Sequence, residues 1–357
     1  PFHIDQAASG EEGLAKISQH AYSLIITDLQ MQPMDGLAVL QSAKTKDPNL
    51  PVLIVTGYGS IPTAVHAMQM GAFEYLTKPL QSDTLLIKVN NALERRRLQL
   101  LLLAQQQKLD EQQRLFKQDL ELARQVQTSL VPKAIVSAAA DVAVQLRPMM
   151  AIGGDQSDVF DDGSGQLYLS VVDVTGHGIA AALMVSRVSS ELNVLVRQRL
   201  EPKQVLYRLN EFCLSNFTGT SLFLTMFCAR YDLAKHSLTY SASAHPSALL
   251  WHSDEHRFAE LASQNRIIGF APAAQDQFLQ DTLPCQAGER LMIVTDGLLE
   301  SENPQGQALG KGGLRTIAQR MLRDPAGPAA VHCIEQVVAY SNGEPPDDLL
   351  VLVCDFK

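Results

Sequence analysis

The feature that most constrains this chain is a long stretch in its first half that contains no helix-breaking residue. Residues 86–131 include neither glycine nor proline, and the next proline is Pro132. Such a run is typical of one continuous helix, and it is too long to be the core helix of a single small domain. We therefore expect three parts: a first domain at residues 1–85, a helical linker at 86–131 and a larger domain at 132–357.

The linker carries a seven-residue repeat with one apolar and one mostly polar register. The apolar register is Leu102, Leu109, Phe116, Ala123 and Leu130. Its partner register is Leu98, Gln105, Gln112, Asp119 and Val126. A seam of this kind predicts a coiled coil and a homodimer through the linker helix. The alternative is a solvated spacer between two domains.

The composition is ordinary for a soluble globular protein, and the chain is expected to be cytoplasmic. No apolar run has the length needed to span a bilayer, so no membrane association is expected. The five cysteines are odd in number and form no CxxC pair, which is typical of reduced thiols. A net charge of -9 disfavours direct binding to nucleic acid.

Three apolar runs in the first domain read as buried parallel strands, at residues 23–28, 51–56 and 73–79. Each run carries a polar residue at or near its end: Asp28, Thr56 and Lys78. The carboxyl ends of parallel strands line the functional crevice of an open sheet. These three residues are therefore a candidate site.

The apolar and polar residues of the larger domain follow a different pattern from those of the first domain. Residues 221–232 and 236–244 predict an antiparallel hairpin, and helical segments are expected at 179–199 and 202–217. Grouped strands and grouped helices favour an α+β sandwich.

Four segments of the larger domain place aspartates at turns, namely 152–158, 171–176, 293–300 and 345–353. Carboxylates that meet at strand ends could hold hard divalent cations such as Mg²⁺ or Mn²⁺. A single aspartate after a strand is more often a turn former or a helix cap. The spacing alone leaves both interpretations open.

Four ordered motifs of this domain resemble the SpoIIE/RsbU-type phosphatases of the PPM (protein phosphatase 2C-like) group. They are GGDQSDVF, DVTGHGIAAALM, TDGLLESENPQGQALG and DDLLVLV, and the resemblance extends over residues 121–357. It implies an α+β sandwich of the PPM type that binds two Mn²⁺ or Mg²⁺ ions. Gln156 and Ser157 depart from the aromatic pair that is usual in the first motif.

The resemblance also implies roles for individual residues. The four catalytic, metal-binding aspartates would be Asp155, Asp173, Asp296 and Asp347, with the backbone carbonyl of Val174 as a further ligand. Asp158 and Asp348 would orient the ligands and water. His177 would stabilise its loop, and the alternative is a general acid near the leaving group.

The first domain resembles a response-regulator receiver, a flavodoxin-like α/β fold, through TDLQMQPMDG, VTGYGS and YLTKPL. By this resemblance Asp28 is the phosphoacceptor of a sensor histidine kinase, and Lys78 pairs with the phosphoryl group. Thr56 and Tyr75 are the switch residues.

The opening residues PFHIDQAASG resemble the second strand of a receiver and its exit. A first strand, a first helix and an acidic pair that binds Mg²⁺ in the complete receiver are expected to precede them. The chain as written is therefore not expected to be phosphorylated efficiently at Asp28.

Together the resemblances predict a cytoplasmic two-component response regulator with a phosphatase output. Its substrate would be phosphoserine or phosphothreonine on a regulatory protein such as an anti-sigma-factor antagonist. The alternative is an RssB-like adaptor that controls the stability of a sigma factor with weak or no phosphatase activity.

Overall fold

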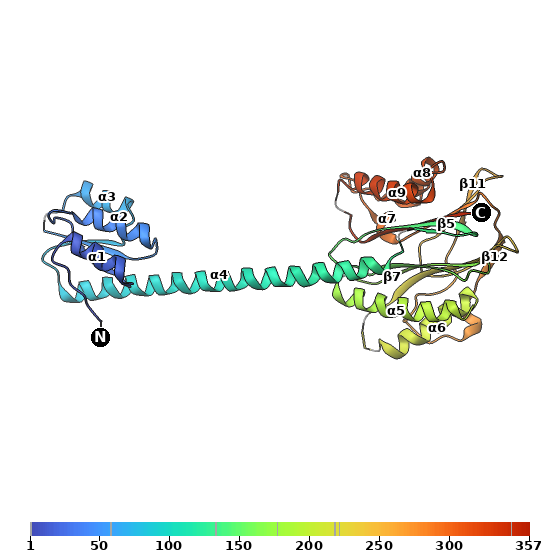
Figure 1. The fold of residues 1–357 in the computed structure, drawn as a ribbon, viewed down its shortest axis with the longest axis horizontal. Coiled ribbons are helices and arrows are strands. Elements are labelled where there is room, and N and C mark those ends of the chain that lie inside the picture. The colour runs from blue at the N-terminus through green and yellow to red at the C-terminus, as the bar shows by residue number, and fades with distance from the viewer. Residues whose placement is uncertain are drawn as a thin grey trace. The chain divides into compact units, whose positions relative to one another are not determined.

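A computed structural model describes residues 2–57, 59–132, 134–176, 178–217, 219–220, 222–343 and 345–357. The chain divides into two compact units, Pro1–Phe116 and Lys117–Lys357. Helix α4 (Ser82–Leu130) is continuous and contributes residues to both units. It begins a few residues before the expected linker and ends one residue before its expected end, so the long helix is confirmed (Figure 1).

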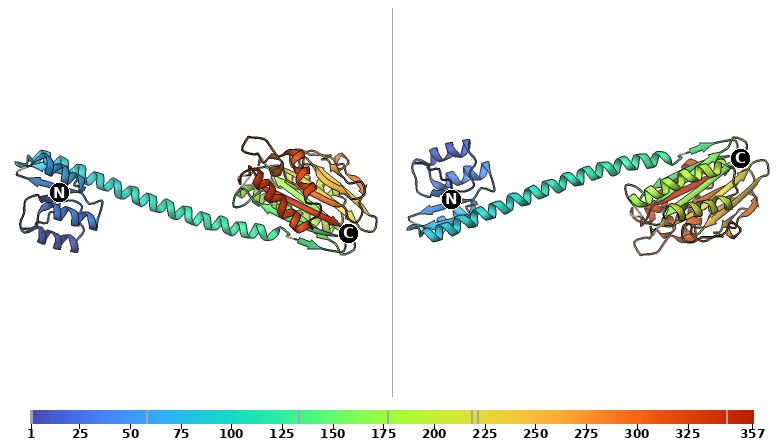
Figure 2. Two further views of the ribbon diagram at one scale, coloured as in Figure 1. Left: turned by 90° about the horizontal axis from the view of Figure 1, so that it is seen from above. Right: turned by 90° about the horizontal axis from the view of Figure 1, so that it is seen from below.

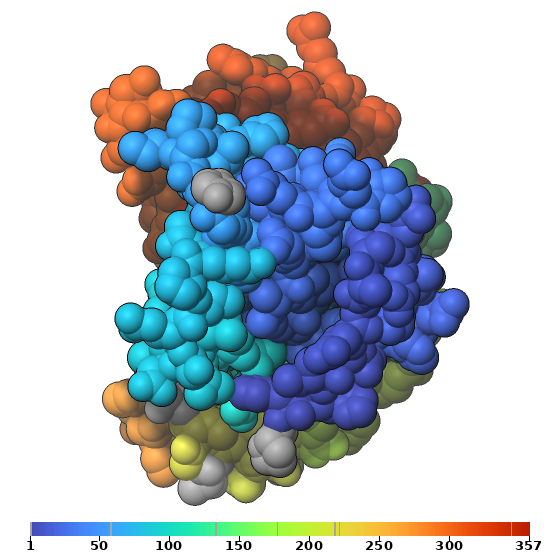
Figure 3. All heavy atoms as spheres, turned by 90° about the vertical axis from the view of Figure 1, so that its left-hand side faces the viewer, coloured from blue at the N-terminus to red at the C-terminus, as the bar shows by residue number. Residues whose placement is uncertain are grey.

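The first unit is a parallel sheet covered by helices. Its strands are β1 (Ile25–Asp28), β2 (Val52–Thr56) and β3 (Glu74–Thr77), in the order β1-β2-β3. Helix α1 (Gly10–Gln19) precedes β1, and α2 (Gly36–Lys46) and α3 (Ile61–Gln69) connect the successive strands. Ser9 and Asp35 cap α1 and α2 by accepting hydrogen bonds from first-turn amides. The surface that these helices and the start of α4 present on one side is seen in Figure 3.

Alternation along β2 explains why both faces of this sheet are covered. Ile54 packs with residues of α2 and α3, whereas Leu53 and Val55 pack with Ala92 of α4 on the other face. The receiver-like, doubly wound fold is therefore confirmed. The strand expected in the opening residues is wrong: residues 2–7 form no strand, and within the described residues nothing pairs with the outer edge of β1.

The second unit contains two antiparallel sheets. One has the order β11-β10-β13-β14-β5-β4 and the other β12-β9-β8-β7-β6. The strands of the first sheet are β4 (Ala134–Val136), β5 (Ala140–Arg147), β10 (Ala248–His252), β11 (Arg257–Leu261), β13 (Arg290–Val294) and β14 (Leu349–Phe356). Those of the second are β6 (Asp155–Asp161), β7 (Gln166–Val174), β8 (Leu224–Asp232), β9 (Ser237–Ser243) and β12 (Asp281–Pro284). The expected hairpin is β8 and β9, paired from Met226–Ser243 to Asp232–Ser237.

Helices cover the outer faces of both sheets. The views in Figures 1 and 2 agree that α5 (Ile179–Arg197) and α6 (Pro202–Asn216) lie on the sheet containing β7. Helices α8 (Gly310–Arg320) and α9 (Ala326–Tyr340) lie on the sheet containing β14. The short α7 (Asp296–Glu300) closely follows β13, and a 3-10 turn spans Gln275–Gln277. The expected α+β sandwich is confirmed.

Three apolar layers hold the sandwich together. The central one joins the facing sides of the two sheets, and one further layer lies beneath each pair of helices. Among the described helices, α5 is the one long and apolar enough to cross a membrane by length and composition. Half of that segment is buried, and its apolar side packs on Val172, Val174 and Met226. It is therefore accounted for as a core helix.

Candidate active site

The acidic site of the second unit is assembled from the ends of four elements. Asp155 is the first residue of β6 and stands directly opposite Asp173, near the end of β7, in the antiparallel register. Asp296 begins α7 immediately after β13. Asp347 and Asp348 precede β14, which is hydrogen-bonded to β13. Folding thus brings four segments that are distant in sequence to one edge of the sandwich.

Asp348 fixes the turn that leads into β6. Its Oδ1 accepts a hydrogen bond from the amide of Met149 at 2.7 Å, and its Oδ2 accepts one from Gly154 at 2.9 Å. A Cβ on Gly153 would lie 1.9 Å from Asp348 Oδ2, and one on Gly154 would lie 2.7 Å from the carbonyl oxygen of Val174. The two glycines are therefore required because the backbone passes too close to both groups.

The side chain of Asp155 is held by a neighbour that the sequence reasoning missed. Thr295 Oγ1 donates to Asp155 Oδ2 at 2.7 Å and accepts a hydrogen bond from the amide of Leu350 at 3.1 Å. Thr295 is fully buried. Its position directly before Asp296 at the end of an apolar strand was the available signal.

Burial and mutual repulsion shift the acidity of this cluster strongly. Burial raises the pKa of Asp155 well above its ordinary value, and the charges of Asp173 and Asp348 raise it further. Burial raises the pKa of Asp173 to about 7, with Asp296, Asp347 and Asp348 as additional causes. Burial also raises the pKa of Asp296 and of Asp348. The ion pairs that aspartates form with described basic side chains lie elsewhere in the chain.

The chemistry of this donor set fits a divalent cation. Several carboxylates that share one region cannot all ionise without a positive charge close by, and oxygen ligands suit Mg²⁺ and Mn²⁺. Within the described residues, no group of three or more acidic, histidine or cysteine side chains is already arranged to hold a metal ion. The carboxylates of the aspartates therefore lie near one another without forming such a group among the described residues.

Asp158, another of the predicted residues, has different surroundings. Asp158 lies away from the cluster and accepts hydrogen bonds from Ser189 Oγ at 2.8 and 3.0 Å and from Asn193 Nδ2 at 3.3 Å, both on α5. It therefore ties β6 to α5. His177 lies outside the described residues.

The polar residues of the first unit also meet. Lys78 Nζ forms an ion pair with Asp28 Oδ2, and this bond holds the pKa of Asp28 below its ordinary value. Thr56 is fully buried at the end of β2. The hydroxyl of Tyr75 lies 3.1 Å from Thr63 Oγ1 in the first turn of α3. The structure thus joins Asp28 to Lys78 and connects Tyr75 to a helix.

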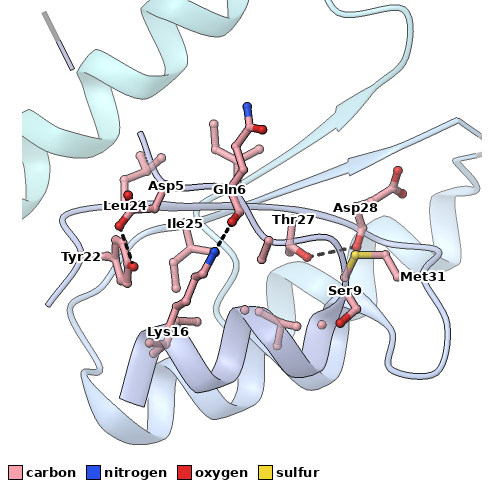
Figure 4. Close-up of a pocket in the computed structure, with 16 residues that line it drawn as sticks. Asp5, Gln6, Ser9, Lys16, Tyr22, Leu24, Ile25, Thr27, Asp28 and Met31 are labelled. Carbon is pink, nitrogen blue, oxygen red and sulfur yellow. Dashed lines mark hydrogen bonds between the residues drawn. The ribbon is translucent and has the colours of Figure 1, made fainter. Parts of the chain in front are cut away.

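A cavity of about 300 Å³ lies beside β1. Residues 5–7, α1 and the strand itself line it, and Asp28 lies among its lining residues (Figure 4). Lys16 donates to the carbonyl of Gln6 across it, and Tyr22 donates to Asp5 Oδ2 at 2.9 Å. The cavity follows the edge of the sheet at β1, with which no described residue pairs.

Comparison with known proteins decides the family. The family described as Stage II sporulation protein E (SpoIIE) matches residues 163–357, more than half of the chain. The chain belongs to the SpoIIE family. The response regulator receiver domain matches residues 1–90. The SpoIIE-type domain is therefore preceded by a receiver.

Individual relatives support the same division. The phosphoserine phosphatase RsbU of Bacillus subtilis is 27% identical over 218 residues, which cover 58% of this chain and 64% of that protein. The C4-dicarboxylate transport transcriptional regulatory protein DctD of Rhizobium meliloti is 41% identical over 97 residues, which are 27% of this chain and 21% of that protein. The chain spans about a fifth of the length of the first curated relatives it matches.

A solved structure shares the fold of the SpoIIE-type domain. The SiaA-PP2C domain of Pseudomonas aeruginosa superimposes with a TM-score of 0.60 at 19% identity and covers 69% of this chain and 98% of that chain. The SpoIIE-type domain therefore has the PP2C fold.

Proposed function

We propose that the chain is a response regulator whose output is a metal-dependent phosphatase for phosphoserine or phosphothreonine on a regulatory protein. The observation that carries the proposal is the cluster of buried aspartates with raised pKa values at the edge of a PP2C-type sandwich. The similarity to a phosphoserine phosphatase supports the same chemistry.

In this proposal Asp155, Asp173, Asp296 and Asp347 supply carboxylate oxygens to two Mn²⁺ or Mg²⁺ ions, and Val174 supplies its carbonyl. Bound ions of this kind polarise a phosphoryl oxygen and activate water at neutral pH. Thr295 donates a hydrogen bond to Oδ2 of Asp155 and so fixes the orientation of that carboxylate. Asp348 accepts backbone hydrogen bonds on both oxygens, and in this proposal it supports the turn.

The receiver would supply the input. Asp28 would accept a phosphoryl group from a sensor histidine kinase, and Lys78 would pair with it. The bond between Tyr75 and Thr63 gives the switch residues a contact with α3 that phosphorylation would change. A homodimer through α4 and a cytoplasmic location complete the proposal.

An anti-sigma-factor antagonist is the proposed class of substrate, following the resemblance to RsbU-type phosphatases. An RssB-like adaptor with an inactive phosphatase domain remains the alternative. The presence of all four proposed metal-binding aspartates favours the enzyme.

The test is phosphate release from a phosphoserine peptide with Mn²⁺, with Mg²⁺ and with a chelator. We expect turnover that depends on the metal and falls by at least about a hundredfold in Asp173→Asn and in Asp296→Asn. Asp254→Asn, in an exposed turn of the same unit, is the matched control and should leave turnover unchanged. Equal turnover in chelator, or in both site variants, would exclude the proposed chemistry.

A further inference from the structure

The last turns of α4 contain one side chain that differs from its surroundings. Beyond Ala92, Gln127 is the one buried residue among those described in α4, with 6% of its surface exposed. Its neighbour Val126 is 58% exposed. The polar amide of Gln127 is thus buried, whereas the apolar side chain of Val126 beside it is exposed. Because burial of an amide is costly without hydrogen bonds, Gln127 must have hydrogen-bond partners.

Both partners belong to a single residue of the active-site turn. Gln127 Nε2 donates to the carbonyl of Gly153 at 2.7 Å, and the amide of Gly153 donates to Gln127 Oε1 at 3.1 Å. Two bonds to one backbone residue fix its position and orientation together, much as a strand partner would. Gln127 therefore clamps Gly153 to the end of α4.

Gly153 has little freedom to move without disturbing the aspartates. The next residue, Gly154, donates its amide to Asp348 Oδ2 at 2.9 Å, and its carbonyl accepts from the amide of Val174 at 3.2 Å. Asp155 follows directly and begins β6. A displacement of the clamp would thus reach Asp155 and the Val174 backbone within two residues.

A second contact ties the same turn of α4 to β6. Gln156 is buried and donates from Nε2 to the carbonyl of Leu130 at 3.4 Å and to that of Ser157 at 3.3 Å. Leu130 is the last residue of α4. The end of α4 is therefore attached on both sides of Asp155, through Gly153 before it and through Gln156 after it.

We propose that Gln127 is a positioning residue through which the end of α4 sets the cation affinity of the acidic site. This inference rests on the proposed metal-dependent function. When the helix end is seated, Gln127 holds the Gly153–Gly154 turn and the aspartates are placed to share a cation. When the helix end shifts, the clamp opens and cation affinity falls. The helix from the receiver thereby controls the site without contacting substrate.

The test compares the full chain with Gln127→Met, which keeps the length and burial of the side chain but removes both hydrogen bonds. Gln125→Leu, on the exposed side of the same turn, is the matched control. Mn²⁺ affinity is measured by titration calorimetry, and amide hydrogen exchange is followed at residues 149–155. Phosphatase turnover is measured as a function of Mn²⁺ concentration.

We expect Gln127→Met to bind Mn²⁺ at least about tenfold more weakly, with kcat at saturating Mn²⁺ within about threefold of the wild type. Exchange should accelerate at Gly153 and Gly154 but not across the rest of the domain. Gln125→Leu should match the wild type in all three measurements.

Unchanged Mn²⁺ affinity and unchanged exchange at Gly154 in Gln127→Met would overturn the inference. So would loss of protection throughout the domain, because Gln127 would then be a general stability residue. If the wild type bound Mn²⁺ but showed no turnover, the proposed phosphatase function would be contradicted. The role of Gln127 could still be tested, because Mn²⁺ affinity and hydrogen exchange do not require turnover. A wild-type chain that bound no Mn²⁺ would overturn both.

Discussion

At the scale of single residues, the acidic site depends on glycines that allow close backbone approach. In Gly154→Ala the new methyl group would lie 2.7 Å from the Val174 carbonyl and 3.3 Å from Ala181 Cβ. Because neither group can move freely, we expect a loss of about 1 to 3 kcal/mol in the free energy of unfolding. Phosphatase activity should fall at least about tenfold as the turn shifts. Urea unfolding and phosphate release measure the two effects.

The control for this prediction is another glycine of the same unit. Nothing lies within 4 Å of a Cβ built on Gly312, inside α8. Gly312→Ala should therefore stabilise the helix by about 0.5 to 1 kcal/mol, because alanine has the higher helix propensity. Similar destabilisation by both substitutions would contradict the steric argument.

Asp158 allows a pH prediction away from the proposed ligands. Burial raises its pKa to about 6, with Ser189 and Asn193 acting in the opposite direction. As pH rises, the carboxyl of Asp158 loses its proton at a lower pH in the unfolded state than in the folded state. The contribution of this group to stability is therefore greatest below about pH 4 and falls as pH rises to about 6. Asp158→Asn should lack this fall, so the free energy of unfolding should decrease between pH 4 and pH 7 by about 1 to 3 kcal/mol less than in the wild type.

The measurement is urea unfolding of wild type and Asp158→Asn between pH 4 and 7 in the presence of a chelator. Ser189→Ala removes a donor to the carboxylate and should extend the fall to higher pH. A constant stability difference across this pH range would show that Asp158 does not titrate there.

At the scale of elements, α4 has an apolar register whose side chains are exposed in a single copy of the chain. Leu102, Leu109 and Phe116 are 67%, 47% and 56% exposed. A second helix would bury this register in a coiled coil. We expect the chain to dimerise and Leu109→Glu with Phe116→Glu to weaken the dimer at least about tenfold, as measured by sedimentation equilibrium. Gln107→Glu, outside both registers, should leave the dimer intact.

Outside the two registers, α4 carries ion pairs on its surface. The ion pairs Glu111–Arg114 and Glu121–Arg124 are exposed, and pairs of this type contribute little to stability. A monomer at every concentration used in the sedimentation experiment would favour the solvated spacer.

At the scale of the whole molecule, the two units have separate apolar cores. Ile54 is fully buried in the first unit and Leu250 in the central layer of the second. Because the cores share no described residue, we expect two calorimetric transitions. Ile54→Ala should lower the transition temperature of the first unit only, and Leu250→Ala that of the second unit only. Each substitution should reduce the free energy of unfolding of its own unit by about 2 to 5 kcal/mol. A single transition shifted by both variants would contradict this independence.

Much of this organisation could be predicted from local sequence patterns. The absence of glycine and proline in residues 86–131 predicted α4, and the apolar runs ending near Asp28, Thr56 and Lys78 predicted β1 to β3. The ordered motifs predicted the sandwich and the segments that carry the aspartates. These features depend on periodicity and turn chemistry between neighbouring residues, which the sequence displays directly.

The tertiary structure alone decided which polar groups hold the site. Gln127 meets Gly153 across 26 positions, and Thr295 meets Asp155 across 140. It also directed Asp158 to α5, away from the aspartates it was expected to support. The sequence by itself determined most of the elements, because local propensity and apolar spacing are properties of neighbouring residues. Its ordered motifs indicated the family by resemblance. Buried hydrogen bonds between distant residues leave no such spacing, since their geometry exists only after the sheets and α4 have packed.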